Sequence, residues 1–168
     1  RYDGYHVLDS LIAFANIGDS ITITSSEAKA DRVELTGPFA SKLAASEPSD
    51  NLAMKALELL RHEGVARDAY FRIALEKNLP VASGIGGGSA NAASVLKAFQ
   101  CTDDRWMDIA LTLGADVPVC VLEQPVHMSG IGEALQPVDL PSNMPLVLIN
   151  PGIAVSTPVV FSKLASKN

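Results

Sequence analysis

A glycine-rich stretch in the middle of the chain limits the possible folds more than any other feature of the sequence. It consists of Gly84, Ile85, Gly86, Gly87, Gly88 and Ser89. An alternating apolar segment, Ala69 to Leu75, precedes it, and apolar residues at helical spacing, from Ala92 to Phe99, follow it. We therefore predict a strand, a glycine loop and a helix in direct succession, with Ser89 as the N-cap of the helix.

Two explanations fit the glycine loop when it is considered alone. Without side chains, its backbone N–H groups can approach a phosphate, and the N-terminus of the following helix adds about half a positive charge. The pattern is not a Walker A motif, because no Gly-Lys-Ser/Thr follows, and it departs from the dinucleotide pattern GxGxxG, because Ser89 takes the place of the last glycine. A close-packed turn without a ligand would also account for the loop.

The remaining patterns predict strands and helices on both sides of this loop. Alternating apolar residues indicate a half-buried hairpin at 20–24 and 32–36, and short apolar runs indicate strands at 119–122 and 146–149, the latter buried. Apolar residues at helical spacing indicate a helix capped by Asp50 and ended by Gly64, and a second helix is predicted at 105–113. Gly130 and Gly132 indicate a turn. The proline-rich stretch 137–145 is the best candidate for a domain boundary. We expect an α+β fold, with one domain over 1–141 and the beginning of a second over 142–168.

Composition and charge exclude several classes of protein. The 168 residues include 13 basic and 19 acidic side chains, and the net charge of −6 has the wrong sign for a surface that attracts nucleic acid. No apolar run is long enough to cross a bilayer. The two cysteines and three histidines lack the spacing of metal ligands. These properties fit a protein of the reducing cytoplasm with no nucleic acid or membrane partner, and they leave the oligomeric state open.

A few polar residues outside the loop could carry chemistry. Asp116 lies in a predicted turn, where it could orient the proton of an attacking hydroxyl group during phosphoryl transfer or simply serve as a turn residue. Tyr5 and His6 could pack together, or they could stack on a base and hydrogen-bond its edge. Asn51 and Lys77 are by default surface residues. Local sequence leaves each of these alternatives open.

Three motifs, taken together in their order and spacing, resemble those of the GHMP superfamily of small-molecule kinases. They are the segments 1–6 (Arg-Tyr-Asp-Gly-Tyr-His), 80–91 with the glycine loop, and 114–118 (Gly-Ala-Asp-Val-Pro). The resemblance is strongest to the branch that acts on a cytidine-containing substrate in the non-mevalonate isoprenoid pathway, and it continues through 130–133 and 151–161. It implies an N-terminal GHMP kinase domain, related to domain 2 of ribosomal protein S5, followed by the start of a ferredoxin-like domain.

The same resemblance implies an activity and a set of site residues. The expected reaction is transfer of the γ-phosphoryl group of ATP to the 2-hydroxyl group of 4-diphosphocytidyl-2-C-methyl-D-erythritol, with Mg²⁺ bridging the ATP phosphates. By resemblance, the loop Gly84 to Ser89 would hold the phosphates, Ser89 could touch Mg²⁺, and Asp116 would be the catalytic carboxylate. Cytidine would be bound by Tyr5, His6 and Phe161, and the adenine pocket would be lined by Asn51, Leu52 and Lys77.

Two features of this kinase family are not found in these 168 residues. One is a lysine upstream of the first motif that partners the catalytic aspartate, and the other is a glycine-rich motif late in the second domain. We therefore expect the chain to be part of a longer enzyme and to be inactive by itself. Other GHMP kinases, of the mevalonate, homoserine or galactose type, would share the loop without needing Tyr5 and His6. A non-catalytic nucleotide- or RNA-binding module would have no use for Asp116.

Overall fold

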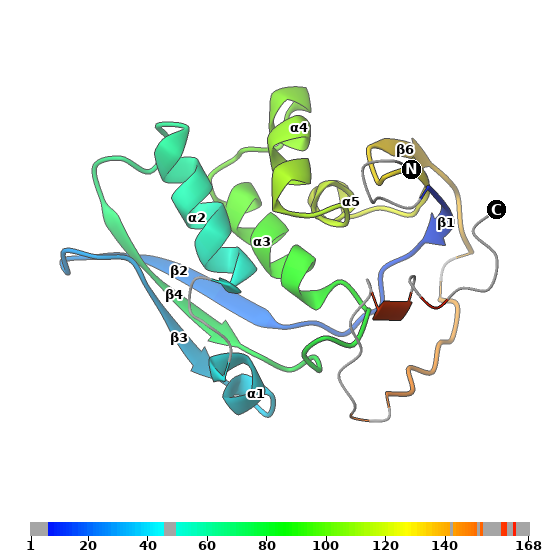
Figure 1. Ribbon diagram of the computed structural model, residues 1–168, viewed down its shortest axis with the longest axis horizontal. Helices are drawn as coiled ribbons and strands as arrows, with labels where there is room; N and C mark the ends of the chain where they lie inside the picture. The colour runs from blue at the N-terminus through cyan, green and yellow to red at the C-terminus, as the bar shows by residue number, and fades with distance from the viewer. Residues whose placement is uncertain are drawn as a thin grey trace.

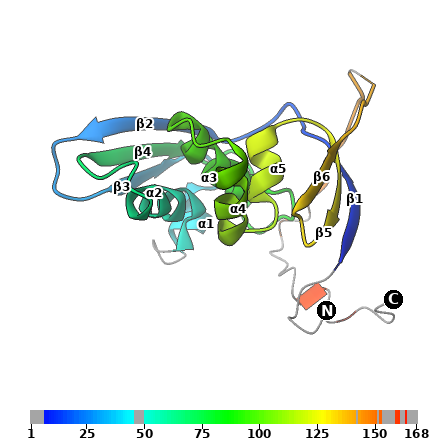
Figure 2. The same ribbon diagram turned by 90° about the horizontal axis from the view of Figure 1, so that it is seen from above.

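The computed structural model describes residues 7–45, 50–141, 143–150, 152, 159–160 and 163. Within them the chain forms two small sheets and a group of helices that packs mainly on the larger sheet (Figure 1). The smaller sheet lies at one end of the molecule (Figure 2). Among the described residues, no helix combines the length and the apolar character that crossing a membrane requires.

The first sheet contains β2 (Ser20–Ser26), β3 (Arg32–Thr36) and β4 (Tyr70–Glu76) in the order β2-β4-β3. The central strand β4 runs antiparallel to β2 and parallel to β3. The predicted hairpin of 20–24 with 32–36 is therefore wrong, because β4 lies between the two strands. Burial explains this order: β4 carries the fully buried Ile73 and Leu75, whereas β2 and β3 alternate between half-buried and exposed residues, as suits edge strands.

The helices α2 (Leu52–His62) and α3 (Gly87–Ala98) cover one face of this sheet (Figure 1). Their buried side chains join those of β4 in the main core, to which α4 (Asp104–Leu113) and α5 (Val117–Leu122) also contribute. The short helix α1 (Ala40–Ala44) follows β3 and has no buried residue. The predicted helices at 52–63, 90–99 and 105–113 are confirmed, and Gly64 ends α2 in a left-handed conformation, with φ of 87°.

The second sheet is an antiparallel meander with its own small core. It consists of β1 (Leu8–Ile12), β5 (Val126–Gly130) and β6 (Ala134–Pro137) in the order β1-β5-β6. Val126 and Met128 of β5 pack against Val119 of α5, which links the two parts of the molecule. The predicted turn at Gly130 and Gly132 is confirmed as the connection between β5 and β6.

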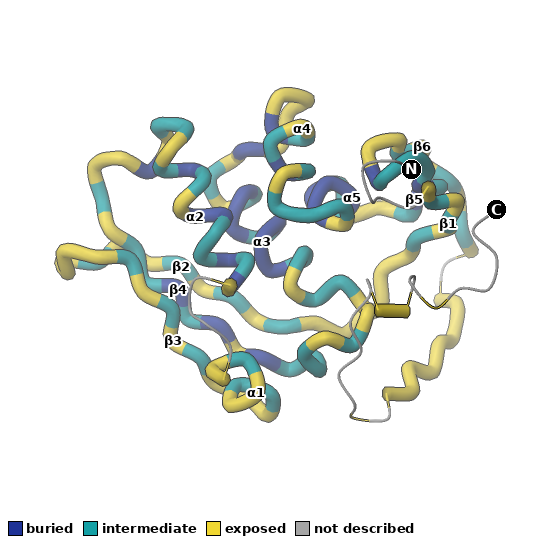
Figure 3. The backbone as a smooth tube through the Cα atoms, viewed as in Figure 1, coloured by how far each residue is buried: buried dark blue, intermediate teal, exposed yellow. Residues whose placement is uncertain are grey.

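Two predicted strands are wrong. The segment 119–122 belongs to α5, because Pro118 suits the first turn of a helix and the apolar side chains of this segment are buried between α3 and α4 on one side and β5 on the other. The segment 146–149 is extended and exposed, with Val147 and Ile149 at 85% and 89% exposure (Figure 3). An apolar run becomes a buried strand only when a partner covers it, and no strand in the described part of the chain pairs with this one.

Candidate functional site

The glycine loop leads into α3 through residues with left-handed backbone conformations. Gly84 and Gly86 both have φ of 74°, and Gly86 is the N-cap of α3. The prediction that Ser89 caps the helix is therefore wrong: Gly86 makes the turn, the helix begins at Gly87, and Ser89 is its third residue. No side chain caps α3, so its first-turn N–H groups stay open to an anion in the cavity that they face.

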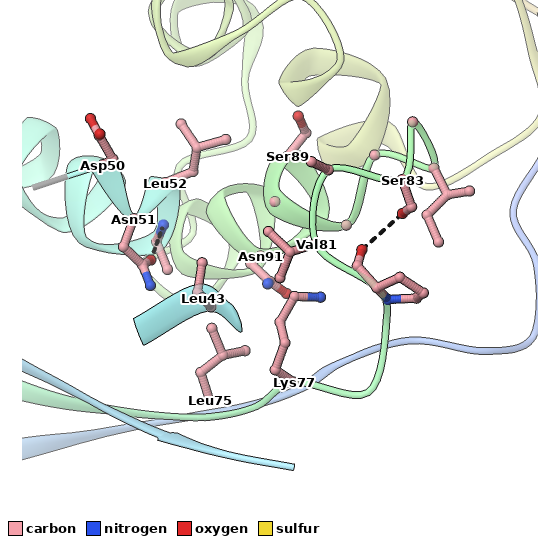
Figure 4. Close-up of a pocket in the computed structure, with 18 residues that line it drawn as sticks. Leu43, Asp50, Asn51, Leu52, Leu75, Lys77, Val81, Ser83, Ser89 and Asn91 are labelled. Atoms are coloured by element: carbon pink, nitrogen blue, oxygen red, sulfur yellow. Dashed lines mark hydrogen bonds between the residues drawn. The ribbon is translucent and has the colours of Figure 1, made fainter. Parts of the chain in front are cut away.

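The loop and the three predicted adenine-pocket residues line a single cavity of about 380 Å³, a size suited to a small ligand (Figure 4). Asn51 and Leu52 come from the start of α2, Lys77 from the end of β4, and the loop itself forms the opposite wall. Several other residues line the cavity without having been predicted as site residues: Leu43, Asp50, Leu75, Ser83 and Asn91. Their sequence signal was weak because each of the five lies in a different element or connection.

Asn51 is buried, which corrects the expectation that it is a surface residue, and it has a structural task in addition to its place on the cavity wall. Its Oδ1 accepts hydrogen bonds from the N–H groups of Ala53 (3.0 Å) and Met54 (3.4 Å), which makes it the N-cap of α2. The prediction that Asp50 is this cap is wrong. Asp50 is one residue too early, and its carboxylate instead pairs with Lys55 at 3.3 Å.

Lys77 is buried, which corrects the expectation that it is a solvated surface cation. Its side chain is 5% exposed, and its Nζ donates to Asp19 Oδ2 and to the carbonyl oxygen of Leu79, both at 2.7 Å. The Asp19 side chain is 1% exposed. A buried cation needs such a partner, since an unpaired charge in the interior is strongly destabilising.

Asp19 is the centre of a polar network below the glycine loop. Besides the Lys77 ammonium group, its carboxylate accepts from the N–H groups of Asn78 and Leu79, both at 2.8 Å, and from Asn91 Nδ2 at 3.0 Å. Burial favours a higher pKa for Asp19, but the hydrogen bonds from Lys77, Leu79 and Asn91 outweigh burial and lower the pKa below its ordinary value. Asp19 is therefore ionised at neutral pH.

This network determines which group in the cavity is available to bind an anion. Because the Asp19 carboxylate pairs with the Lys77 ammonium group, Lys77 adds little net positive charge to the cavity wall. The first turn of α3 lies just above the ion pair: a Cβ on Gly87 would be 3.6 Å from Lys77 Nζ and 3.7 Å from Asp19 Oδ2. The open N–H groups of this turn are thus the main candidate for anion binding.

Asp116 lies outside this cavity wall, at the start of α5. The N–H of Val117 donates to the carbonyl oxygen of Gly114 (3.0 Å), so Ala115 and Asp116 are the central residues of a β-turn. Asp116 is exposed and does not cap α5 with its side chain. Since α5 packs against α3, the aspartate and the glycine loop are held by neighbouring helices. Tyr5, His6 and Phe161 lie outside the described residues.

The neighbourhood of Asp116 also fixes the state of a cysteine. Burial, reinforced by the carboxylates of Asp116 and Glu123, raises the pKa of Cys120 to about 11. The thiol of Cys120 is therefore protonated at neutral pH, and it is a packing residue between α5 and the two cores.

The fold and the cavity resemble those of known kinases. Residues 51–124 match the family model described as the GHMP kinases N terminal domain. The described part of the chain has the α+β fold of this domain, as predicted, and it resembles a crystal structure of 4-(cytidine 5'-diphospho)-2C-methyl-D-erythritol kinase with a TM-score of 0.62 and 34% identity. That match covers 84% of this chain and 49% of the other.

Similarity in sequence extends to particular kinases. The chain is 50% identical over 98% of its length to 4-diphosphocytidyl-2-C-methyl-D-erythritol kinase of Paracoccus denitrificans, of which it covers 55%. The kinases of the same name from Ruegeria pomeroyi and Chelativorans sp. are 50% and 45% identical over 99% of the chain. The chain spans somewhat more than half the length of these relatives, 58% in the latter two. The resemblance to cytidine-linked kinases is confirmed.

Proposed function

We propose that the protein carrying this chain uses ATP to phosphorylate the 2-hydroxyl group of 4-diphosphocytidyl-2-C-methyl-D-erythritol. The observation that carries the proposal is the cavity in which the open N-terminus of α3 faces the start of α2. The N-terminus of α3 suits a triphosphate. The start of α2 suits a flat base, because it contributes the apolar Leu52 and the polar Asn51 to the cavity wall. The similarity to kinases of this substrate supports the choice of acceptor.

In this proposal the loop Gly84 to Ser89 holds the phosphates through backbone N–H groups. Asn51, Leu52 and Lys77 form the base pocket, Tyr5, His6 and Phe161 recognise cytidine, and Asp116 orients the attacking hydroxyl group and accepts its proton. Phosphoryl transfer needs little beyond such positioning and charge stabilisation. An exposed carboxylate at the start of a helix that packs on α3 suits the role of Asp116.

A magnesium ion fits this arrangement as a companion of the nucleotide. In the described part of the chain, no three His, Cys, Asp or Glu side chains are grouped to hold a metal ion. Mg²⁺ commonly binds through substrate phosphates with one or two protein ligands. The hydroxyl group of Ser89, which lines the cavity, is the candidate to contact it, and the ion would neutralise charge on the phosphates.

Turnover by the complete protein tests the proposal. With ATP and the cytidine-linked methylerythritol, we expect a singly phosphorylated product, and we expect none with mevalonate, homoserine or galactose. Changing Asp116→Asn should lower kcat by about 10²–10⁴-fold and leave ATP binding, measured by calorimetry, unchanged. Asp108→Asn is the matched control, because Asp108 is also exposed and lies one helix earlier. Full turnover by Asp116→Asn would contradict the role of this residue.

A further inference from the structure

The turn between β5 and β6 lies directly against the turn that carries Asp116. The carboxylate of Asp116 forms no hydrogen bond or ion pair with any residue that the structure describes. Its position is therefore set by the backbone of the β-turn at Ala115 and Asp116, and by whatever supports that turn.

Gly132 is the residue that supports it. Gly132 is buried, and a Cβ at this position would lie 2.6 Å from the carbonyl oxygen of Ala115 and 3.1 Å from its Cβ. Its φ of 114° is also one that only glycine adopts without strain. The carbonyl group that it touches belongs to the peptide linking Ala115 to Asp116, so any side chain on Gly132 would push on the backbone of Asp116.

The support is itself held firmly. The N–H of Gly132 donates to the carbonyl oxygen of Ser129 (3.3 Å), and the carboxylate of Glu133 accepts from the N–H of Ile131. β5 is the central strand of its sheet and pairs with β6 up to Ser129 and Ala134, at the mouth of the turn. The turn is thus a fixed part of the sheet against which the peptide of Asp116 rests.

We propose that Gly132 is a positioning residue for phosphoryl transfer, acting through the Ala115–Asp116 peptide. This inference rests on the proposed function, because it requires Asp116 to face the acceptor hydroxyl group. A displacement of about 1 Å at such a group can cost about 10²-fold in rate. Since Gly132 does not line the nucleotide cavity, a change there affects the reacting geometry and not the binding of ATP.

Replacing Gly132 by alanine in the complete protein tests this role. We expect Gly132→Ala to lower kcat about 100-fold while the KM for ATP changes by less than about twofold. The matched control is Gly64→Ala: Gly64 has φ of 87°, and a Cβ there would meet the flexible guanidinium group of Arg67 at 3.1 Å, at the far end of α2. Gly64→Ala should lower Tm as Gly132→Ala does, but it should leave kcat unchanged. Equal kcat values for the two variants would overturn the proposal.

Two further variants separate the possible causes. In an Asp116→Asn background, Gly132→Ala should not lower the residual turnover further, whereas an additional 100-fold loss would show that Gly132 acts elsewhere. If Gly132→Ala does not fold, Glu133→Ala is the deciding variant, because it loosens the turn without adding an atom. It should lower kcat and leave the KM for ATP unchanged. An unchanged kcat would refute the role of the turn. If Asp116→Asn is inactive and Gly132→Ala keeps normal activity, only the role of Gly132 is contradicted. If Asp116→Asn keeps its activity, both proposals are contradicted.

Discussion

At the scale of single residues, Asp19 is the side chain that holds the segments around the glycine loop together. Its carboxylate receives hydrogen bonds from the segment that links β4 to the glycine loop and from Asn91 on α3. It also neutralises Lys77 on the cavity wall. One buried side chain therefore fixes both ends of the loop and neutralises the positive charge on the cavity wall.

Replacing Asp19 by asparagine should leave Lys77 buried without a counter-charge. We expect the free energy of unfolding of Asp19→Asn, measured with urea, to fall by about 3–5 kcal/mol. Adding Lys77→Met should recover part of this loss because it removes the unpaired cation. Asp50→Asn is the control, since Asp50 pairs with Lys55 on the exposed surface and its loss should cost less than about 1 kcal/mol. A similar cost for the two single changes would contradict the importance of the network.

The lowered pKa of Asp19 also gives the protein a specific sensitivity to acid. The unfolded chain binds the proton first as the pH falls, because the pKa of Asp19 is lowered in the folded protein and has its ordinary value, about 3.9, in the unfolded chain. The stabilisation is complete above that pH and is lost as the pH falls through the folded-state pKa. The free energy of unfolding measured in urea should therefore fall more steeply below about pH 4 for the wild type than for Asp19→Asn. Parallel pH profiles would show that Asp19 is not the titrating group.

At the scale of elements, α2 is tied to the sheet by a clamp at its C-terminal end. The guanidinium group of Arg61 binds both carboxylate oxygens of Asp31 (2.7 and 3.0 Å) and the carbonyl oxygen of Ala69 (2.9 Å). Asp31 in turn accepts from the N–H of Phe71 at the start of β4 (2.7 Å). The other end of α2 forms part of the cavity wall, so the clamp stabilises the helix that lines the cavity.

A lysine cannot replace Arg61 in this clamp, because one ammonium group cannot reproduce the planar fork of the guanidinium group. We expect Arg61→Lys to lower the free energy of unfolding by about 2 kcal/mol, as measured in urea. Lys55→Met, on the exposed side of the same helix, should change it by less than about 0.5 kcal/mol. If Arg61→Lys unfolds like the wild type, the clamp is a passive surface contact.

The elements also show which parts of the fold a sequence reveals. Helices α2 and α4 were predicted because their periodicity and end residues are local, as was β4 because its apolar residues alternate. The segment 119–122 was mistaken for a strand, since a short apolar run has no period long enough to decide. The pairing of β2 and β3 with β4 was missed because it depends on contacts far apart in the chain.

The candidate site follows the same division. The glycine loop was proposed from its motif, and Asn51, Leu52 and Lys77 were proposed from the family resemblance. The structure brings them to one cavity. Asp19 was missed, because nothing local marks an aspartate that will meet a lysine 58 residues away. Ser89 was placed wrongly as a cap, since a left-handed glycine performs that task through its backbone and leaves no side-chain signal.

At the scale of the whole molecule, one apolar segment stands apart from both cores. Residues 146–149 are extended and exposed on the outside of the described structure (Figure 3). Changing both Val147 and Ile149 to lysine should therefore alter the free energy of unfolding of this chain by less than about 0.5 kcal/mol, and it should reduce association seen by light scattering. A marked loss of stability would mean that the segment is packed in solution.

The network around Asp19 has a consequence for the order in which the protein assembles. Its hydrogen bonds join residues up to 72 positions apart: Asp19 directly before β2, Lys77 directly after β4, and Asn91 in α3. The amide protons of Asn78 and Leu79 are held by that carboxylate, so they exchange with solvent only when these three segments separate. We therefore expect the glycine loop to become ordered late in folding, after the long-range pairing of the sheet, and its slow amide exchange to report on global unfolding of the part of the chain that the structure describes.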